Sequence, residues 1–177
     1  MYITTSLRRC AVVAGGSAGA LALVASAAVG ITSDPITGTN HVDDLKGTSG
    51  ADVIYARGGN DWVVGRAGGD EIHGNGGRDY LGGGKNRDVV IGGPDADSLA
   101  PAGGADRVFG GRGKDTVYLT KDHRVDQVNC GSGRDKVWGV TKRDDVSANC
   151  EHVTTTMPSC RIVPMRLAGQ YATEARC

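Results

Sequence analysis

Aspartate recurs every nine residues through the middle of this chain, and an aliphatic residue follows each aspartate two positions later. The eight aspartates are Asp52, Asp61, Asp70, Asp79, Asp88, Asp97, Asp106 and Asp115. The eight aliphatic residues are Ile54, Val63, Ile72, Leu81, Val90, Leu99, Val108 and Val117. A fixed period this short is typical of a solenoid, in which each unit buries its apolar side only against its neighbours. The period therefore predicts a stacked all-β solenoid.

Each nonapeptide divides into a turn and a short strand. The fourth position holds only Gly, Asn or Asp, the residue types that tolerate a left-handed backbone. These residues are Gly50, Gly59, Gly68, Gly77, Asn86, Asp95, Gly104 and Gly113. The first six residues of a unit are therefore predicted to form a turn that ends at the aspartate. The last three are predicted to form a strand whose middle side chain points inward.

A strand of three residues must pair with a neighbour to persist. If each nonapeptide is half a coil, the odd and even units form two parallel sheets with their aliphatic rows packed together. The loops then stack on two edges at a spacing of about 4.8 Å. One edge is predicted to carry Asp52, Asp70, Asp88 and Asp106. The other edge is predicted to carry Asp61, Asp79, Asp97 and Asp115.

Stacked carboxylates repel one another, and a cation between the coils removes that repulsion. Two carboxylates and the loop carbonyls supply the shell of six or more oxygens that calcium prefers. Magnesium requires a tighter octahedron, and zinc prefers nitrogen and sulfur ligands, which the loops lack. The acidic ladder therefore predicts bound calcium.

The unit GGRGKDTVY at 110–118 has the pattern G-G-x-G-x-D-x-U-x at every fixed position. On residues 47–118 the chain resembles the haemolysin-type, or RTX, calcium-binding repeat, which has this pattern. The resemblance implies a right-handed parallel β-roll with calcium between successive turns on each edge. It also implies that the ligands are the sixth-position carboxylates and the carbonyls of the turn glycines. The implied ligands are Asp52, Asp61, Asp70, Asp79, Asp88, Asp97, Asp106, Asp115, Gly50, Gly59, Gly68, Gly77, Gly104 and Gly113.

Basic residues are frequent in the predicted turns, so the sequence leaves other interpretations open beside calcium binding. They are Arg57, Arg66, Arg78, Lys85, Arg87, Arg112 and Lys114. Either these side chains form a solvated rim around the ions, or some of them pair with the aspartates and replace calcium. A third possibility is a structural solenoid without metal, which gives no reason for aspartate in every turn.

A weaker nine-residue period continues after the ladder. Leu119 and Thr120 break the register, after which a row of valines and a row of aspartates resume. These residues are Val128, Val137 and Val146, and Asp126, Asp135 and Asp144. Because most turn glycines are missing here, residues 119–153 are predicted to extend the sheets while binding little calcium. The tail at 154–177 has no clear period.

Cys130 and Cys150 are separated by one coil of eighteen residues plus two, which places them on neighbouring loops of the same edge. That spacing suits a disulfide, and a staple would cap the open last coil. The four cysteines that follow Cys10 allow three connectivities, of which the pairs Cys130–Cys150 and Cys160–Cys177 rank first. The alternative for the first pair is a zinc site, with ligands Cys130, Cys150, His123 and His152.

The N-terminus has the features of an export signal at residues 1–27. Arg8 and Arg9 precede a long run of small and apolar residues, and Ala25-Ser26-Ala27 is a cleavage pattern. The pattern favours cleavage and secretion, by a general or a twin-arginine route, although the run is long enough for a membrane anchor. Residues 28–46 are predicted to be a polar linker.

Charge and motifs exclude several functions. With 20 basic and 20 acidic residues, the chain has no nucleic-acid footprint. It lacks H-E-x-x-H, and its regular carboxylates do not form the singular site that an enzyme needs, so we expect neither catalysis nor a small-molecule substrate.

Large side chains are predicted to point outward from both sheets: Tyr55, His73, Ile91 and Phe109 on one, and Trp62 and Tyr80 on the other. They either pack along the strands or dock an unknown partner, a second copy or the tail. The sequence therefore predicts a secreted calcium-binding β-roll that folds or rigidifies on binding calcium. The alternative is a cell-surface interaction or adhesion module in which calcium is only structural.

Overall fold

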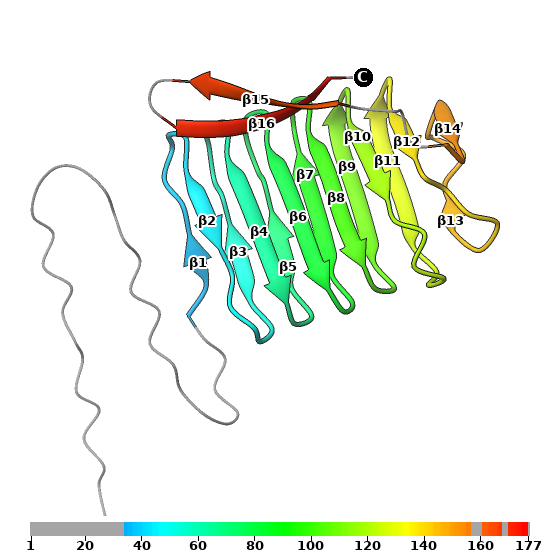
Figure 1. The fold of residues 1–177 in the computed structure, drawn as a ribbon, viewed down its shortest axis with the longest axis horizontal. Coiled ribbons are helices and arrows are strands. Elements are labelled where there is room, and N and C mark those ends of the chain that lie inside the picture. Colours follow the sequence, from blue (N-terminus) through cyan, green and yellow to red (C-terminus); the bar gives the residue numbers. More distant parts are fainter. Residues whose placement is uncertain (1–33, 157–160, 168–169, 177) are drawn as a thin grey trace, which may run out of the picture.

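The computed structural model describes residues 34–156, 161–167 and 170–176. In these residues the chain is all β, and two seven-stranded parallel sheets face each other in a flattened coil (Figure 1). The first sheet contains β1 (Ile36–Thr37), β3 (Val53–Tyr55), β5 (Glu71–His73), β7 (Val89–Gly93), β9 (Arg107–Gly113), β11 (Gln127–Gly133) and β13 (Asp145–Val146). The second contains β2 (Asp44–Lys46), β4 (Trp62–Ala67), β6 (Tyr80–Lys85), β8 (Ser98–Gly103), β10 (Thr116–Leu119), β12 (Lys136–Trp138) and β14 (His152–Thr154). The predicted parallel β-solenoid is confirmed.

Each strand pairs with the strand two further along the chain, so one coil contains two nonapeptides. In the first sheet Ile54 pairs with Ile72, Ile72 with Val90, and Val90 with Val108. The eighteen-residue step confirms that each nonapeptide is half a coil. It also confirms that odd and even units build separate sheets.

The core is the double row of aliphatic side chains between the sheets. All eight predicted inward residues, from Ile54 to Val117, are completely buried. Val128 and Val137 continue the rows. Each unit thus contributes one large apolar side chain, whose burial is worth roughly 1.5–3 kcal/mol.

The insertion at Leu119 and Thr120 lengthens one coil without interrupting the sheets. Thr116 pairs with Lys136, a step of 20 residues, and Leu119 is completely buried in the core. The inserted loop also contacts the previous coil, because Asp122 accepts a 2.7 Å hydrogen bond from the Gly104 amide. Residues after the insertion therefore extend the roll, as the sequence predicts.

The roll begins earlier than the sequence predicts. Strands β1 and β2 lie inside the expected linker at 28–46, and Gly38–Lys46 forms a further half-coil with Asp43 in the sixth position. The unit is hard to recognise because His41 occupies its fourth position. At the other end, the tail contains two antiparallel strands that pair with each other, β15 (Arg161–Leu167) and β16 (Gln170–Arg176).

Positive backbone φ angles mark two positions of the turn, whereas the sequence predicts one. The fourth position is confirmed at Gly59, Gly68, Gly77, Asn86, Asp95 and Gly113. The second position is also left-handed, at Arg57, Arg66, Asn75, Gly84, Gly93, Ala102 and Gly111. Several strands run past the predicted three residues up to this bend, so β6 and β8 are six residues long.

The predicted export signal and the Cys160–Cys177 pairing lie outside the described residues. Within the part of the chain that the structure describes, no helix is long and apolar enough to cross a membrane.

Candidate metal sites between the coils

The aspartates form two continuous ladders along the edges of the roll. The amide of each aspartate donates a hydrogen bond to Oδ1 of the aspartate one coil further on, as from Asp61 to Asp79 at 2.8 Å and from Asp79 to Asp97 at 2.9 Å. One ladder runs through Asp43, Asp61, Asp79, Asp97, Asp115, Asp135 and Glu151. The other runs through Asp52, Asp70, Asp88, Asp106, Asp126 and Asp144.

The second carboxylate oxygen of most rungs is buried without a hydrogen-bond donor in the described chain. These oxygens are Oδ2 of Asp61, Asp70, Asp79, Asp88, Asp97, Asp106, Asp115 and Asp135. The residues themselves are at most 3 % exposed. A buried carboxylate oxygen without a partner is costly, so this repeated arrangement indicates that a cation belongs beside it.

Glycine in the first position of the unit leaves room beside Oδ2 of five of these residues, Asp70, Asp79, Asp88, Asp97 and Asp115. A Cβ on Gly74 would lie 2.6 Å from Oδ2 of Asp79 and 2.7 Å from the carbonyl oxygen of Gly92 on the next coil. A Cβ on Gly83 would lie 2.6 Å from both Asp88 Oδ2 and the Pro101 carbonyl oxygen. These first-position carbonyls were not predicted, although glycine at six of the eight first positions was a usable signal.

The predicted fourth-position carbonyls also face the space between coils wherever a glycine lies on the next coil. The carbonyl oxygens of Gly50, Gly59 and Gly113 lie directly against the fourth-position glycines one coil later. A Cβ built on Gly104 would be close to both the Asn86 carbonyl oxygen and Oδ1 of Asp106. Loop oxygens from adjacent coils thus approach both oxygens of the ladder carboxylates.

Within residues 34–156 no ion pair neutralises a ladder carboxylate. Burial raises the pKa of Asp79 to about 6 and those of Asp97 and Asp106 to about 7, and repulsion from neighbouring carboxylates adds to the effect of burial. The hydrogen bonds from the backbone amides act in the opposite direction.

The turn bases do not supply the missing charge. All seven are exposed, and the ion pairs found in residues 34–156 are Lys46–Asp44 and His73–Glu71, neither of which involves a ladder residue. The structure therefore supports the solvated rim rather than replacement of calcium by Arg or Lys. Nor do three or more His, Cys, Asp or Glu side chains converge anywhere in these residues. A cation would therefore depend on carboxylate pairs and carbonyl oxygens.

Asp52 differs from the seven later aspartates that the sequence assigns as ligands. Its Oδ2 accepts hydrogen bonds from the amide of Thr48 at 2.6 Å and from the Thr48 hydroxyl at 3.0 Å. Asp43 is capped in the same way by Thr39. A threonine therefore satisfies the carboxylate at the beginning of each ladder.

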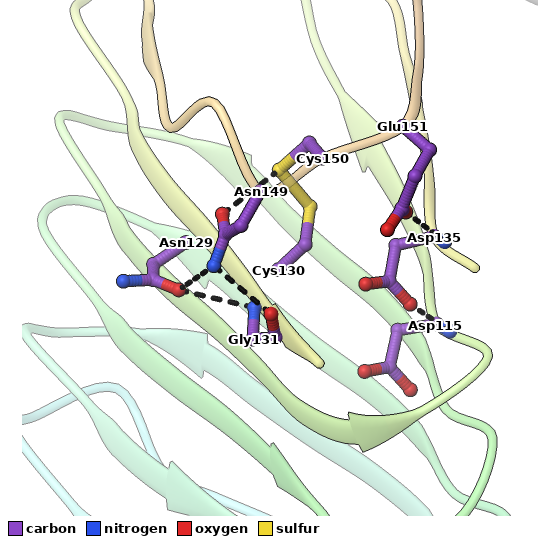
Figure 2. The surroundings of a disulfide bond; sticks show 8 residues. All are labelled: Asp115, Asn129, Cys130, Gly131, Asp135, Asn149, Cys150 and Glu151. Atoms are coloured by element: carbon purple, nitrogen blue, oxygen red, sulfur yellow. Dashed lines mark hydrogen bonds between the residues drawn. A yellow bond between two sulfur atoms is a disulfide. The ribbon is translucent and has the colours of Figure 1, made fainter. Parts of the chain in front are cut away.

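Cys130 and Cys150 form a disulfide with a Cα–Cα distance of 5.3 Å (Figure 2). The predicted pairing is confirmed. The alternative zinc site is wrong, because the two sulfur atoms are bonded to each other and no metal-binding cluster occurs in the described residues.

Comparison with known families agrees with this geometry. The family model of the RTX calcium-binding nonapeptide repeat matches residues 37–72, 64–99 and 91–122. Residues 37–122 of this chain are therefore RTX calcium-binding nonapeptide repeats, and calcium is the ion that such repeats bind. Repeats of this family are typically non-catalytic. No curated protein and no solved structure matches the chain.

Proposed function

We propose that this protein is a secreted, non-enzymatic β-roll whose coils are ordered by calcium bound between the stacked aspartate rungs. The observation that carries the proposal is a buried Oδ2 that has no donor among the described residues, repeated on seven successive units from Asp61 to Asp115. A hard divalent cation supplies the positive charge and the oxygen coordination that this arrangement lacks.

Each ion would lie between two coils of one edge. Its protein ligands would be Oδ2 of one aspartate, the carboxylate of the aspartate one coil later, and carbonyls from the two turns. At the Asp79 rung these groups are Asp79, Asp97 and the Gly92 carbonyl. All are oxygen ligands, which suits calcium and excludes a zinc preference. Seven such oxygens predict seven ions, and the last two, at Asp106 and Asp115, also use Asp126 and Asp135 on the following coil. Asp52 is excluded by its threonine cap.

We expect calcium to order the roll because its hydrophobic core is small. Each nine-residue unit buries a single large aliphatic side chain, while every residue of the unit loses backbone freedom on folding. Without ions the buried carboxylates also repel one another along each ladder. We therefore expect the calcium-free roll to be at most marginally stable and the calcium-bound roll to be ordered.

A calcium titration followed by far-ultraviolet circular dichroism and thermal melting tests this proposal. The β signal and the melting temperature are expected to rise together with calcium, and magnesium at the same concentration should reproduce little of the effect. The proposal fails if the chelated protein has the full β signal and the same melting temperature as the calcium-loaded protein.

Secretion is supported by the N-terminal sequence, with its arginine pair, apolar run and Ala25-Ser26-Ala27 pattern. For an extracellular calcium module we expect weak binding, with dissociation constants of about 10⁻⁴–10⁻³ M. Expression of the full chain, followed by N-terminal sequencing of protein from the medium, checks both export and cleavage. Protein retained in the membrane with Met1 intact would support an anchor instead.

The second candidate is an interaction module in which calcium is only structural. Its support is two aromatic stacks on the outer faces, Trp62 on Tyr80 with ring centroids 4.0 Å apart and Tyr55 on His73 at 4.7 Å. Stacks of this kind also stabilise neighbouring strands, so they are not specific to docking. The Trp62→Ala/Tyr80→Ala variant separates the two roles. Loss of cell-surface adhesion with unchanged calcium binding would favour the interaction module.

A further inference from the structure

One ladder continues beyond the matched repeats and ends in a glutamate. The amide of Asp135 donates a 2.6 Å hydrogen bond to Oε2 of Glu151, where each earlier rung of this ladder uses Oδ1 of an aspartate. Figure 2 shows Asp115, Asp135 and Glu151 stacked in one column, with the Glu151 carboxylate directly beyond Asp135.

Asp135 has the same unsatisfied oxygen as the aspartates of the matched repeats. The residue is completely buried, and its Oδ2 has no hydrogen-bond donor within residues 34–156. In Figure 2 this oxygen lies on the same side of the column as the second oxygen of Glu151. A buried carboxylate oxygen without a donor in the described chain therefore lies one rung before the exposed carboxylate of Glu151, at the end of the ladder.

The other ladder ends differently. The Oδ2 atom of its last aspartate, Asp144, accepts hydrogen bonds from the amide of Thr141 at 2.7 Å and from the Thr141 hydroxyl at 2.9 Å. Those donors replace a cation, as Thr39 and Thr48 do at the first coils. The Asp135–Glu151 pair has no such cap in the described chain, so the two ladder ends form a natural contrast.

The disulfide holds Glu151 in this position. Cys150 immediately precedes Glu151, and its partner Cys130 lies in the first position of the unit that contains Asp135. The Asn149 side chain adds hydrogen bonds of 2.8 Å to Asn129 Oδ1 and 3.0 Å to the Gly131 carbonyl. This last coil is short, since Lys136 pairs with His152 only 16 residues later. The covalent bond therefore fixes a segment that few strand contacts hold.

We propose that Asp135 and Glu151 bind one further calcium ion outside the matched repeats, and that the Cys130–Cys150 disulfide builds this site by fixing Glu151 in the ladder. The inference rests on the proposed function, because it assumes that ions occupy the space between rungs. It extends that function to a glutamate-containing pair that the repeat pattern does not include.

The test compares wild type with the Glu151→Gln variant of the full chain, using equilibrium dialysis against radioactive calcium. Glutamine retains an oxygen that accepts the Asp135 amide hydrogen bond but removes the charge. The variant is expected to bind one ion fewer at saturation. The matched control is Asp144→Asn at the threonine-capped end of the other ladder, which should bind as many ions as wild type.

The dialysis separates two kinds of failure. If Glu151→Gln binds as many ions as wild type with the same affinities, the Asp135–Glu151 site is contradicted while the proposed function stands. If wild type binds no calcium, the proposed function itself is contradicted.

A second variant tests the role of the disulfide. Cys130→Ser/Cys150→Ser should lose the same single ion, and adding Glu151→Gln to it should remove no further ion. If the disulfide-free variant retains the ion that Glu151→Gln loses, the assigned role of the disulfide is wrong.

Discussion

The amide of Asp97 donates a 2.9 Å hydrogen bond to Oδ1 of Asp115, eighteen residues later and one coil away, while Oδ2 of Asp115 is buried with no donor in the described part of the chain. One carboxylate therefore serves two coils. Its first oxygen completes the backbone hydrogen bonding of the previous turn, and its second faces the proposed ion. Because Asp79, Asp88, Asp97, Asp106 and Asp115 all repeat this division, each of them couples the two proposed ions on either side of it. A substitution at one of these aspartates should therefore weaken calcium binding at two sites.

This coupling predicts that Asp79→Ala is more harmful than Asp126→Ala. Asp79 lies between Asp61 and Asp97 within the matched repeats, and its Oδ2 lacks a donor, whereas Oδ2 of Asp126 is not among the buried donor-free oxygens. Asp79→Ala should lose two ions and, by leaving the Asp61 amide unpaired, about 1–3 kcal/mol of stability. Asp126→Ala should lose at most one ion. Calorimetric titration of both variants measures the difference, and equal losses would contradict it.

The space beside Oδ2 gives a prediction for glycine. Alanine at Gly74 would place its Cβ 2.6 Å from Asp79 Oδ2 and 2.7 Å from the Gly92 carbonyl, the two oxygens assigned to one ion. Ala56 already occupies a first position, so the fold accepts a methyl group there. Gly74→Ala should therefore weaken one calcium site while the calcium-loaded fold persists. Gly50→Ala is the control, because the nearest atom to its Cβ would be 3.8 Å away. Similar affinity losses in both variants would contradict the assignment.

The sequence predicted the parts of this structure that the nine-residue period controls. Each aspartate and the aliphatic residue two positions later define the pitch of the coil, so the two sheets, the core and the ladders follow from spacing alone. The Cys130–Cys150 bond was predictable for the same reason, since the separation of the two cysteines is close to one coil.

Features that depend on local contacts were not predictable from the period. The first half-coil was missed because His41 replaces the turn glycine, while Asp43 still pairs through the Asp61 carboxylate. The threonine cap on Asp52 and the glutamate that ends one ladder are side-chain substitutions with no periodic signal. The left-handed backbone at Arg57 and Arg66 was also not predictable from the sequence. Arginine rarely adopts this conformation, and the packing of the coils imposes it here.

The shifted pKa values predict that acid stabilises the calcium-free roll. The pKa of Asp97 rises from its ordinary value of 3.8 to about 7 in the folded chain, mainly through burial, and that of Asp88 rises to about 6. The folded state therefore binds protons more tightly than the unfolded state, and stability falls as pH rises through 6 to 7. The chelated protein should melt at a higher temperature at pH 5 than at pH 8.

Calcium should reverse this trend, because protons compete with the ion for the same carboxylates. In saturating calcium the melting temperature should be higher at pH 8 than at pH 5. Thermal scans at the two pH values, with and without chelator, give the four temperatures. A chelated protein that is more stable at pH 8 would show that the ladder carboxylates are not the groups that control its stability.

The disulfide predicts a boundary in local stability. It closes a loop of twenty residues, for which the chain-entropy estimate is roughly 3 kcal/mol. It also lies beyond residue 122, where the matched repeats end. In calcium, the Cys130→Ser/Cys150→Ser variant should therefore exchange backbone hydrogens faster over residues 121–153 and at the wild-type rate over residues 47–118. Hydrogen-exchange mass spectrometry measures both regions in one experiment. Uniformly faster exchange along the whole roll would mean that the staple stabilises all coils together and that calcium does not hold the matched repeats on its own.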